Sequence, residues 1–178
     1  MRTATIVLVA YLLCVVVAAV WRLLPWITDA IPDLGALTAA YLGLTARRQV
    51  SPAIGGAIVL GYLIDLISGV PAGLGALVLA LTTLVARTVQ QRILVRGAVI
   101  SIAFSAFVAL FAGVLAWLVR ELYRVPSAAF GVEFGHLLAV QVATAIVGPL
   151  VWRLFRRIDA TFARTHRERD AALEGLAP

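Results

Sequence analysis

The sequence has few charged residues, although its balance of charge is strongly basic. Only 13% of the 178 residues are charged, and lysine does not occur, so the 15 basic residues are all arginines. Hydrophobic residues make up 62%, whereas roughly half is typical of a soluble domain. This composition excludes an ordinary soluble domain. The net charge of +6 does not indicate nucleic-acid binding, because the arginines cluster at the ends of apolar runs.

Residues that catalyse reactions or bind metals are also scarce. The single cysteine, Cys14, excludes an internal disulfide and a cysteine metal site. His136, with Gln141 and Thr144, offers too few ligands for zinc, and we interpret the three as interhelical hydrogen-bonding groups or interface residues. No nucleophile motif surrounds a serine, and the glycine-rich stretch 69–75 lacks the Lys-Ser/Thr ending of a phosphate-binding loop. We expect no enzyme activity, no cofactor and no metal site.

Long apolar runs predict an all-α integral membrane protein with six transmembrane helices. The first run is too long for a cleaved signal peptide and is expected to be retained as a helix. The second is short, so it must be shallow, longer than predicted, or sheltered by its neighbours. The predicted spans are residues 3–24, 31–46, 52–68, 72–93, 97–120 and 133–155, and together they form one transmembrane domain, residues 1–155.

The last predicted span and the segment after it have separate signals. Gly148 and Pro149 predict a kink in the last span. Residues 156–178 are predicted to form a basic cytoplasmic tail. Phe155, just before this tail, and Ile158 and Phe162 within it have helical spacing. This spacing is typical of a basic amphipathic helix on the anionic inner leaflet, with a docking segment for a cytoplasmic partner as the alternative.

The arginines predict the orientation in the membrane. Six spans place both termini on one side, and twelve of the 15 arginines then fall on that side, with Arg22, Arg120 and Arg124 on the other. Basic loops stay in the cytoplasm, so we expect both termini to be cytoplasmic. The twelve are Arg2, Arg47, Arg48, Arg87, Arg92, Arg96, Arg153, Arg156, Arg157, Arg164, Arg167 and Arg169.

Asp65 is the acidic side chain that stands inside an apolar run rather than beside one. An ionisable group in hydrocarbon is costly, so it needs a partner or a function. Ala53, Ala57 and Gly61 precede it at intervals of four, which predicts that Asp65 points into a packed seam. We expect its carboxylate to accept backbone N–H groups near Gly73 to Gly75, at the start of the next helix. Binding of a cation, a proton or a ligand is the alternative.

Small residues recur at intervals of four in further spans. These stripes let membrane helices approach closely, and they are expected mostly to pack the bundle itself. One stripe could be left over to receive a transmembrane helix of a partner. The stripes are Gly35/Ala39/Gly43, Ala53/Ala57/Gly61, Ala76/Ala80 and Ser105/Ala109/Gly113.

Two segments resemble the bacterial rod shape-determining MreD family. Pro32-Asp33 opens an early span that contains Tyr41-Leu42, as in that family. A hairpin with the family's pattern Asp-x-x-Ser-Gly-x-Pro-x-Gly follows. The resemblance is specific over about residues 32–96. Its hairpin residues are Asp65, Ser68, Gly69, Pro71, Gly73 and Gly75, which join Pro32, Asp33 and Tyr41 as candidate structural or interaction residues.

The resemblance implies a non-enzymatic scaffold of the cell-elongation machinery in the bacterial inner membrane. The partners that it implies are the bitopic protein MreC, the MreB filament, and the glycan polymerase and transpeptidase of side-wall peptidoglycan synthesis. The implied fold is similar to the six-helix substrate-binding S-components of energy-coupling-factor vitamin transporters. An S-component-like transporter subunit is therefore the alternative function, and Cys14 and Ala18 form a small-xxx-small pair of the kind those subunits use for docking.

Overall fold

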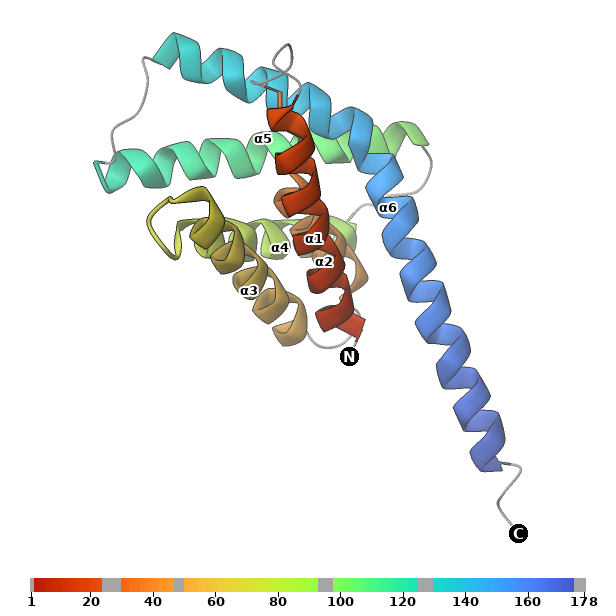
Figure 1. Cartoon of the computed structure of the whole chain (residues 1–178). Coiled ribbons are helices and arrows are strands. Elements are labelled where there is room, and N and C mark those ends of the chain that lie inside the picture. Colours follow the sequence, from red (N-terminus) through yellow and green to blue (C-terminus); the bar gives the residue numbers. More distant parts are fainter. Residues whose placement is uncertain (1, 24–29, 47–49, 93–97, 125–129, 175–178) are drawn as a thin grey trace.

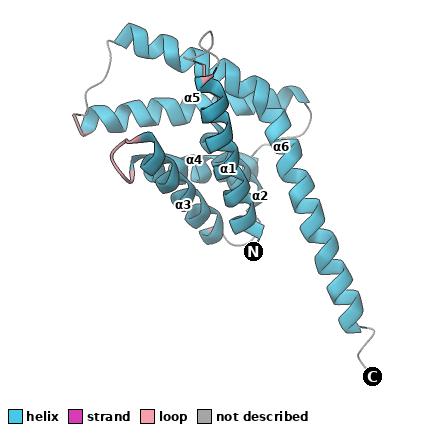
Figure 2. Ribbon diagram, viewed as in Figure 1, coloured by secondary structure: helices cyan, strands magenta, loops and turns pink. Residues whose placement is uncertain are grey.

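The computed structural model describes residues 2–23, 30–46, 50–92, 98–124 and 130–174. Figure 2 shows helices joined by loops in this part of the chain. Five of the helices are long and apolar enough to cross a membrane, so the chain is a multi-pass helical membrane protein. The helices are α1 (Arg2–Arg22), α2 (Leu34–Thr45), α3 (Ser51–Ser68), α4 (Leu74–Arg92), α5 (Ala98–Leu122) and α6 (Phe130–Glu174) (Figure 1).

The second predicted span is the one that differs most from a membrane-crossing helix. Helix α2 has only 12 residues, or about 18 Å at 1.5 Å per residue, against a hydrocarbon core of about 30 Å. It begins at Leu34, three residues after the predicted start, because Asp33 is its N-cap and Pro32 lies outside it. Residues 34–43 are all buried, and α2 contacts every other helix. A short helix is tolerated here because its neighbours shelter it from lipid.

The predicted small-residue stripes bring helices of this bundle together. A Cβ added at Gly61 would lie 2.5 Å from the Gly75 carbonyl oxygen, and one at Gly43 would collide with the Thr83 carbonyl oxygen. Backbones of α3 and α2 therefore each approach α4 closely. On α5, a Cβ at Gly113 would lie 2.6 Å from Leu137 of α6. The four stripes thus serve internal packing wholly or in part.

Helix α6 continues well past its predicted end. It runs for 45 residues without a break, through the boundary predicted at residue 155 and on to Glu174. Pro149 lies inside it, and the helix changes direction along its course, as the missing N–H and the ring of an internal proline would cause (Figure 1). Phe155 is fully buried and Ile158 packs against the core, so the first turn of the predicted tail belongs to the bundle.

Aromatic side chains fix α6 against the centre of the bundle. The ring of Phe155 lies 5.2 Å from that of Tyr41 on α2, and Trp152 lies 5.7 Å from Phe104 on α5. The indole N–H of Trp152 also donates to the Leu37 carbonyl at 3.3 Å. These contacts satisfy the buried indole N–H and explain why the helix continues past residue 155.

The structure places one end of α1 beside the distal part of α6. Arg2 forms an ion pair with Asp159, so the start of α1 and this part of α6 lie at the same end of the bundle. The cytoplasmic orientation of the termini stays a prediction. Of the arginines behind it, Arg47, Arg48 and Arg96 lie outside the described residues.

Candidate functional site

Asp65 pins the hairpin between α3 and α4, as the sequence predicts. Its side chain is 4% exposed. The backbone N–H of Gly73 donates to Oδ2 at 2.9 Å, and that of Gly75 lies 2.9 Å from both carboxylate oxygens. These amides open α4 and have no partner within the helix. The carboxylate therefore supplies the acceptor that these two N–H groups lack within the helix. Its negative charge also complements the positive end of the α4 dipole.

The hairpin sequence suits this cap because three of its positions require glycine. Gly69 ends α3 with φ of 67°, and Gly73 has φ of 102°, a region that side chains disfavour. A Cβ at Gly75 would lie 2.5 Å from Oδ1 of Asp65 and would displace the carboxylate. Ser68, Gly69 and Pro71 are exposed, so the turn between the pinned helices is open to a partner.

Asp33 caps α2 and ties it to α6. Its Oδ1 accepts the N–H of Ala36 at 2.8 Å, while its own N–H donates to the Thr144 hydroxyl oxygen at 2.9 Å. Thr144 on α6 is fully buried, and the bond that it accepts from Asp33 confirms its predicted interhelical role, while its own hydroxyl donates to the Val140 carbonyl within α6. His136 is exposed and Gln141 half-buried, and their predicted role stays a prediction.

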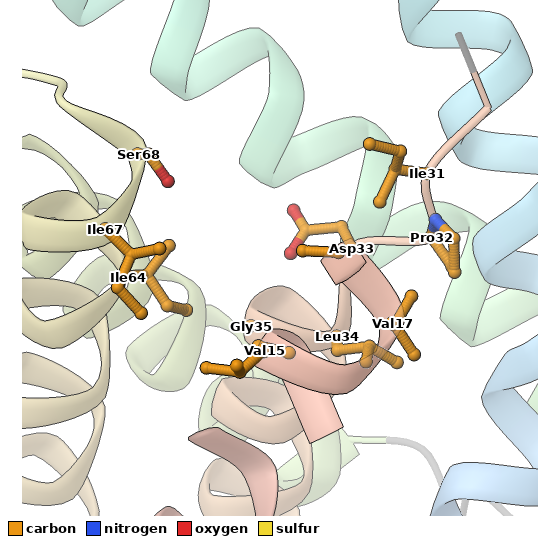
Figure 3. A pocket seen from close by; sticks show the side chains of 12 residues that line it. Val15, Val17, Ile31, Pro32, Asp33, Leu34, Gly35, Ile64, Ile67 and Ser68 are labelled. Carbon is orange, nitrogen blue, oxygen red and sulfur yellow. The ribbon is translucent and has the colours of Figure 1, made fainter. Parts of the chain in front are cut away.

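A groove lies between the second half of α1, the start of α2 and the end of α3. Its volume is about 380 Å³. Figure 3 shows the Asp33 carboxylate and the Ser68 hydroxyl facing the same space, with Ile64 and Ile67 on the α3 side. The small side chains of Cys14 and Ala18 line the α1 side. The groove is therefore mostly apolar, with a hydroxyl and a carboxylate near one end of the bundle.

The candidate residues from the sequence fall into three places. Pro32, Asp33 and Ser68 line the groove. Asp65, Gly73 and Gly75 form the cap beside it, with Gly69 and Pro71 in the exposed turn. Tyr41 does not join them, because it lies eight residues along α2 from Asp33, about 12 Å at 1.5 Å per residue.

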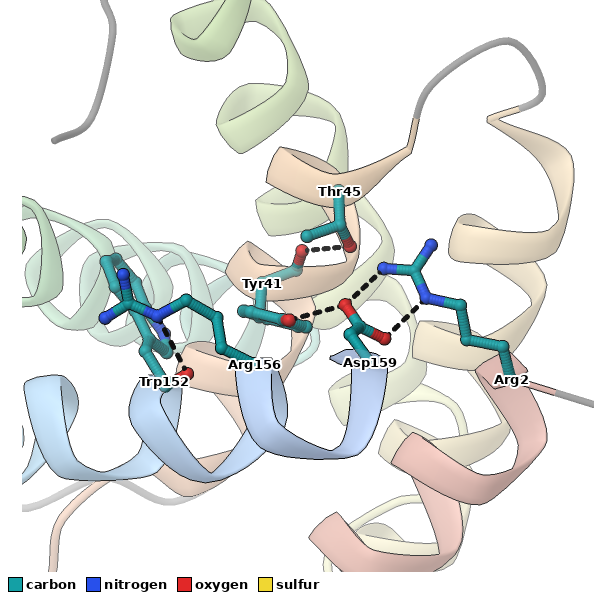
Figure 4. A network of polar contacts seen from close by, with 6 residues as sticks. All are labelled: Arg2, Tyr41, Thr45, Trp152, Arg156 and Asp159. Carbon is teal, nitrogen blue, oxygen red and sulfur yellow. Dashed lines mark hydrogen bonds and ion pairs between the residues drawn. The ribbon is translucent and has the colours of Figure 1, made fainter. Parts of the chain in front are cut away.

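Tyr41 belongs instead to a polar network at the opposite end of α2 (Figure 4). Its hydroxyl donates to Oδ2 of Asp159 at 2.6 Å. Arg2 donates two hydrogen bonds to the same carboxylate, from Nε to Oδ1 and from Nη2 to Oδ2, both at 2.6 Å. One carboxylate on α6 therefore joins α1 and α2, with the bidentate geometry that makes arginine–carboxylate pairs strong.

We expect Asp159→Ala to destabilise the protein more than Arg2→Ala or Tyr41→Phe. The first change leaves both Arg2 and Tyr41 without their acceptor, whereas each of the others removes only one of the two residues that donate to Asp159. The expected losses in the free energy of unfolding are about 2 kcal/mol for Asp159→Ala and about 1 kcal/mol or less for the others, since Arg2 is partly solvated. Unfolding in detergent micelles, followed by circular dichroism, measures all three. Equal losses would show that Asp159 does not join the two contacts.

Asp159 was not among the candidate residues, because residues 156–178 were predicted to form a cytoplasmic tail. A signal was present: Asp159 is the single acidic residue between Glu133 and Glu168, and it follows the buried Phe155 by four positions. A second pair was also missed, that of Arg120 on α5 with Glu133 on α6, whose atoms lie 3.2 Å apart. The first pair joins helices that are far apart in the sequence, whereas the second joins the consecutive helices α5 and α6.

Neither a metal-binding group among the described residues nor a match to a known protein adds a further candidate site. Within the described ranges, no three His, Cys, Asp or Glu side chains come together as a metal-binding group. Comparisons of the chain with family models, with curated proteins and with solved structures give no match. The site consists of the pinned hairpin and the apolar groove beside it.

Proposed function

We propose that the protein is a non-enzymatic scaffold of the cell-elongation machinery in the bacterial inner membrane, of the MreD type, which holds the transmembrane helix of MreC. The observation that carries the proposal is the role of the hairpin motif. The motif residues Asp65, Gly73 and Gly75 form the cap, and Ser68 lies in the wall of an apolar groove. The motif thus builds a fixed surface at the edge of the bundle.

The hydrogen bonds of the carboxylates support a scaffold rather than a transport pathway. Asp65, Asp33 and Asp159 each accept hydrogen bonds from their own chain. A transport carboxylate must exchange its partner for a substrate or an ion during the cycle. Here the acidic groups fasten α4, α2 and α6, which suits a rigid platform.

The groove suits a partner helix because small side chains form one of its walls. Cys14 and Ala18 stand four positions apart on α1 and let a second backbone approach. A hydroxyl or amide on the partner helix could donate to the Asp33 carboxylate or bond to Ser68 near the end of the groove. We propose that MreC occupies this groove, and that MreB and the glycan polymerase and transpeptidase assemble with the pair.

Co-purification with MreC in detergent tests the proposal, with a matched pair of variants on α1. Ala18 lines the groove, whereas its neighbour Ala19 is exposed and does not. Ala18→Trp should reduce recovery of MreC by about tenfold, the loss caused by roughly 1.4 kcal/mol of steric conflict, while Ala19→Trp should retain it. Failure of the unmodified protein to bind MreC would overturn the proposal. Equal binding by both variants would move the partner to another face.

An S-component-like subunit of a vitamin transporter is the second candidate. The exposure of the Cys14 and Ala18 pair on the groove favours it, because that pair is also suited to docking on a transporter subunit. Mass spectrometry of the purified protein separates the two functions. A vitamin retained in stoichiometric amount, together with no binding of MreC, would establish the transporter subunit and exclude the scaffold.

A further inference from the structure

A second groove lies between α1 and α6, on a different side of α1 from Cys14 and Ala18. Its volume is about 430 Å³. Leu13 and Val17 of α1, with Leu34 at the start of α2, form one wall, and residues of α6 form the other. Val17 and Leu34 also border the first groove. Nothing in the proposed scaffold function uses this groove. Its α6 residues are Val147, Leu150, Val151, Arg153, Leu154 and Arg157.

Two arginines stand at one end of this apolar groove. Arg153 and Arg157 are four positions apart and therefore neighbours on one face of α6. Both are exposed, and no carboxylate of the described residues forms an ion pair with either. Asp159, the acidic residue nearest along α6, is engaged by Arg2 and Tyr41. Two positive charges thus face the groove without a counter-charge from this part of the chain.

The spacing of residues along α6 gives the groove the length of a phospholipid headgroup and part of an acyl chain. Arg157 lies two positions from Asp159, which contacts the start of α1, so the arginines lie near that end of the bundle. Val147 lies ten positions from Arg157, which is about 15 Å along the helix, away from that end of the bundle and toward the middle of the bundle. The apolar part of this wall, from Leu154 to Val147, spans seven positions or about 10 Å, which covers about two-thirds of one leaflet of a bilayer core of roughly 30 Å.

We propose that the α1–α6 groove binds one anionic diacyl phospholipid. Its phosphate lies between Arg153 and Arg157, and an acyl chain lies along Leu154, Leu150 and Val147. Guanidinium groups pair strongly with phosphate, and basic pockets between membrane helices are typical sites for anionic headgroups. A zwitterionic lipid would leave the two positive charges unbalanced. A partner helix would fill the apolar part but would place no anion between the arginines.

Native mass spectrometry of the full chain in detergent tests the proposal, with dioleoyl phosphatidylglycerol and dioleoyl phosphatidylcholine as probes. We expect one phosphatidylglycerol to be retained in preference to phosphatidylcholine. Arg153→Gln with Arg157→Gln should weaken phosphatidylglycerol retention by about thirtyfold, the effect of two juxtamembrane charges. The matched control, Arg156→Gln with Arg92→Gln, removes two exposed arginines that do not line the groove and should change retention by about twofold or less.

The acyl chain is tested separately. Leu150→Trp should displace the lipid by filling the groove, while a photoreactive residue at position 150 should label phospholipid in membranes. Equal loss in the control pair, or retention that does not distinguish the two lipids, would overturn the site. If soluble glycerol phosphate competed with the lipid, the site would bind only the headgroup phosphate. If the photoreactive residue labelled protein alone, the groove would bind a partner helix. Either result would overturn the proposal without affecting the co-purification of MreC.

Discussion

Replacing Asp65 with leucine should lower the free energy of unfolding by about 3 to 5 kcal/mol, because it leaves the partly buried N–H groups of Gly73 and Gly75 without an acceptor. The α3–α4 hairpin would lose its cap, and leucine cannot replace a hydrogen bond to either amide. Titration with a denaturing detergent, followed by circular dichroism, measures the change in purified protein. Partner recovery should fall together with stability, since the hairpin forms one side of the proposed groove.

Asp65→Asn is the matched control for the charge. Both amides lie 2.9 Å from Oδ2, so an amide oxygen in that position keeps both as donors. The side-chain NH₂ would then face the N–H of Gly75 in place of Oδ1, so we expect a loss of about 1 to 2 kcal/mol. Equally severe loss of MreC binding in both variants, at normal stability, would contradict the capping role. It would show instead that the negative charge itself is required.

The part of the fold that follows from local rules could be predicted from the sequence. Apolar length located the long helices, and the spacing of Ala53, Ala57 and Gly61 placed Asp65 in a seam. The cap at Gly73 and Gly75 followed from the unpaired amides at a helix start. Asp33 was predicted inside the second span, whereas the structure makes it the N-cap of α2, which begins three residues after the predicted start. The correct inferences depend on residues within one helix or on both sides of one short turn.

The parts that could not be predicted depend on contacts between distant segments. Hydropathy indicates where a helix leaves the membrane, but it does not indicate where the helix stops packing against neighbouring helices. Phe155 and Asp159 stand in a charged stretch, and only the positions of Tyr41 and Arg2, on other helices, show that this stretch packs against the bundle. The short length of α2 is a similar case. Only its contacts with every other helix explain why a helix too short to cross the membrane is tolerated.

Glycine-to-alanine changes at two positions of α3 should have opposite effects on stability. A Cβ at Gly61 would lie 2.5 Å from backbone atoms of Gly75 and Ala76, which cannot move without separating α3 from α4. We expect Gly61→Ala to lower the free energy of unfolding by about 2 to 3 kcal/mol. A Cβ at Gly55 would meet nothing within 4 Å, so Gly55→Ala should raise it by about 0.5 to 1 kcal/mol through helix propensity alone.

The pair also separates packing from partner binding. Both changes add one methyl group to the same helix, so the same denaturing titration isolates the effect of the α3–α4 contact. Similar small effects at both positions would contradict the close approach of α3 and α4 at Gly61. A Gly55→Ala protein that is stable but no longer binds MreC would have a different meaning. It would place the partner on the α1–α3 surface near Gly55, rather than in the groove at Asp33, because Gly55 lines a separate hollow between these helices.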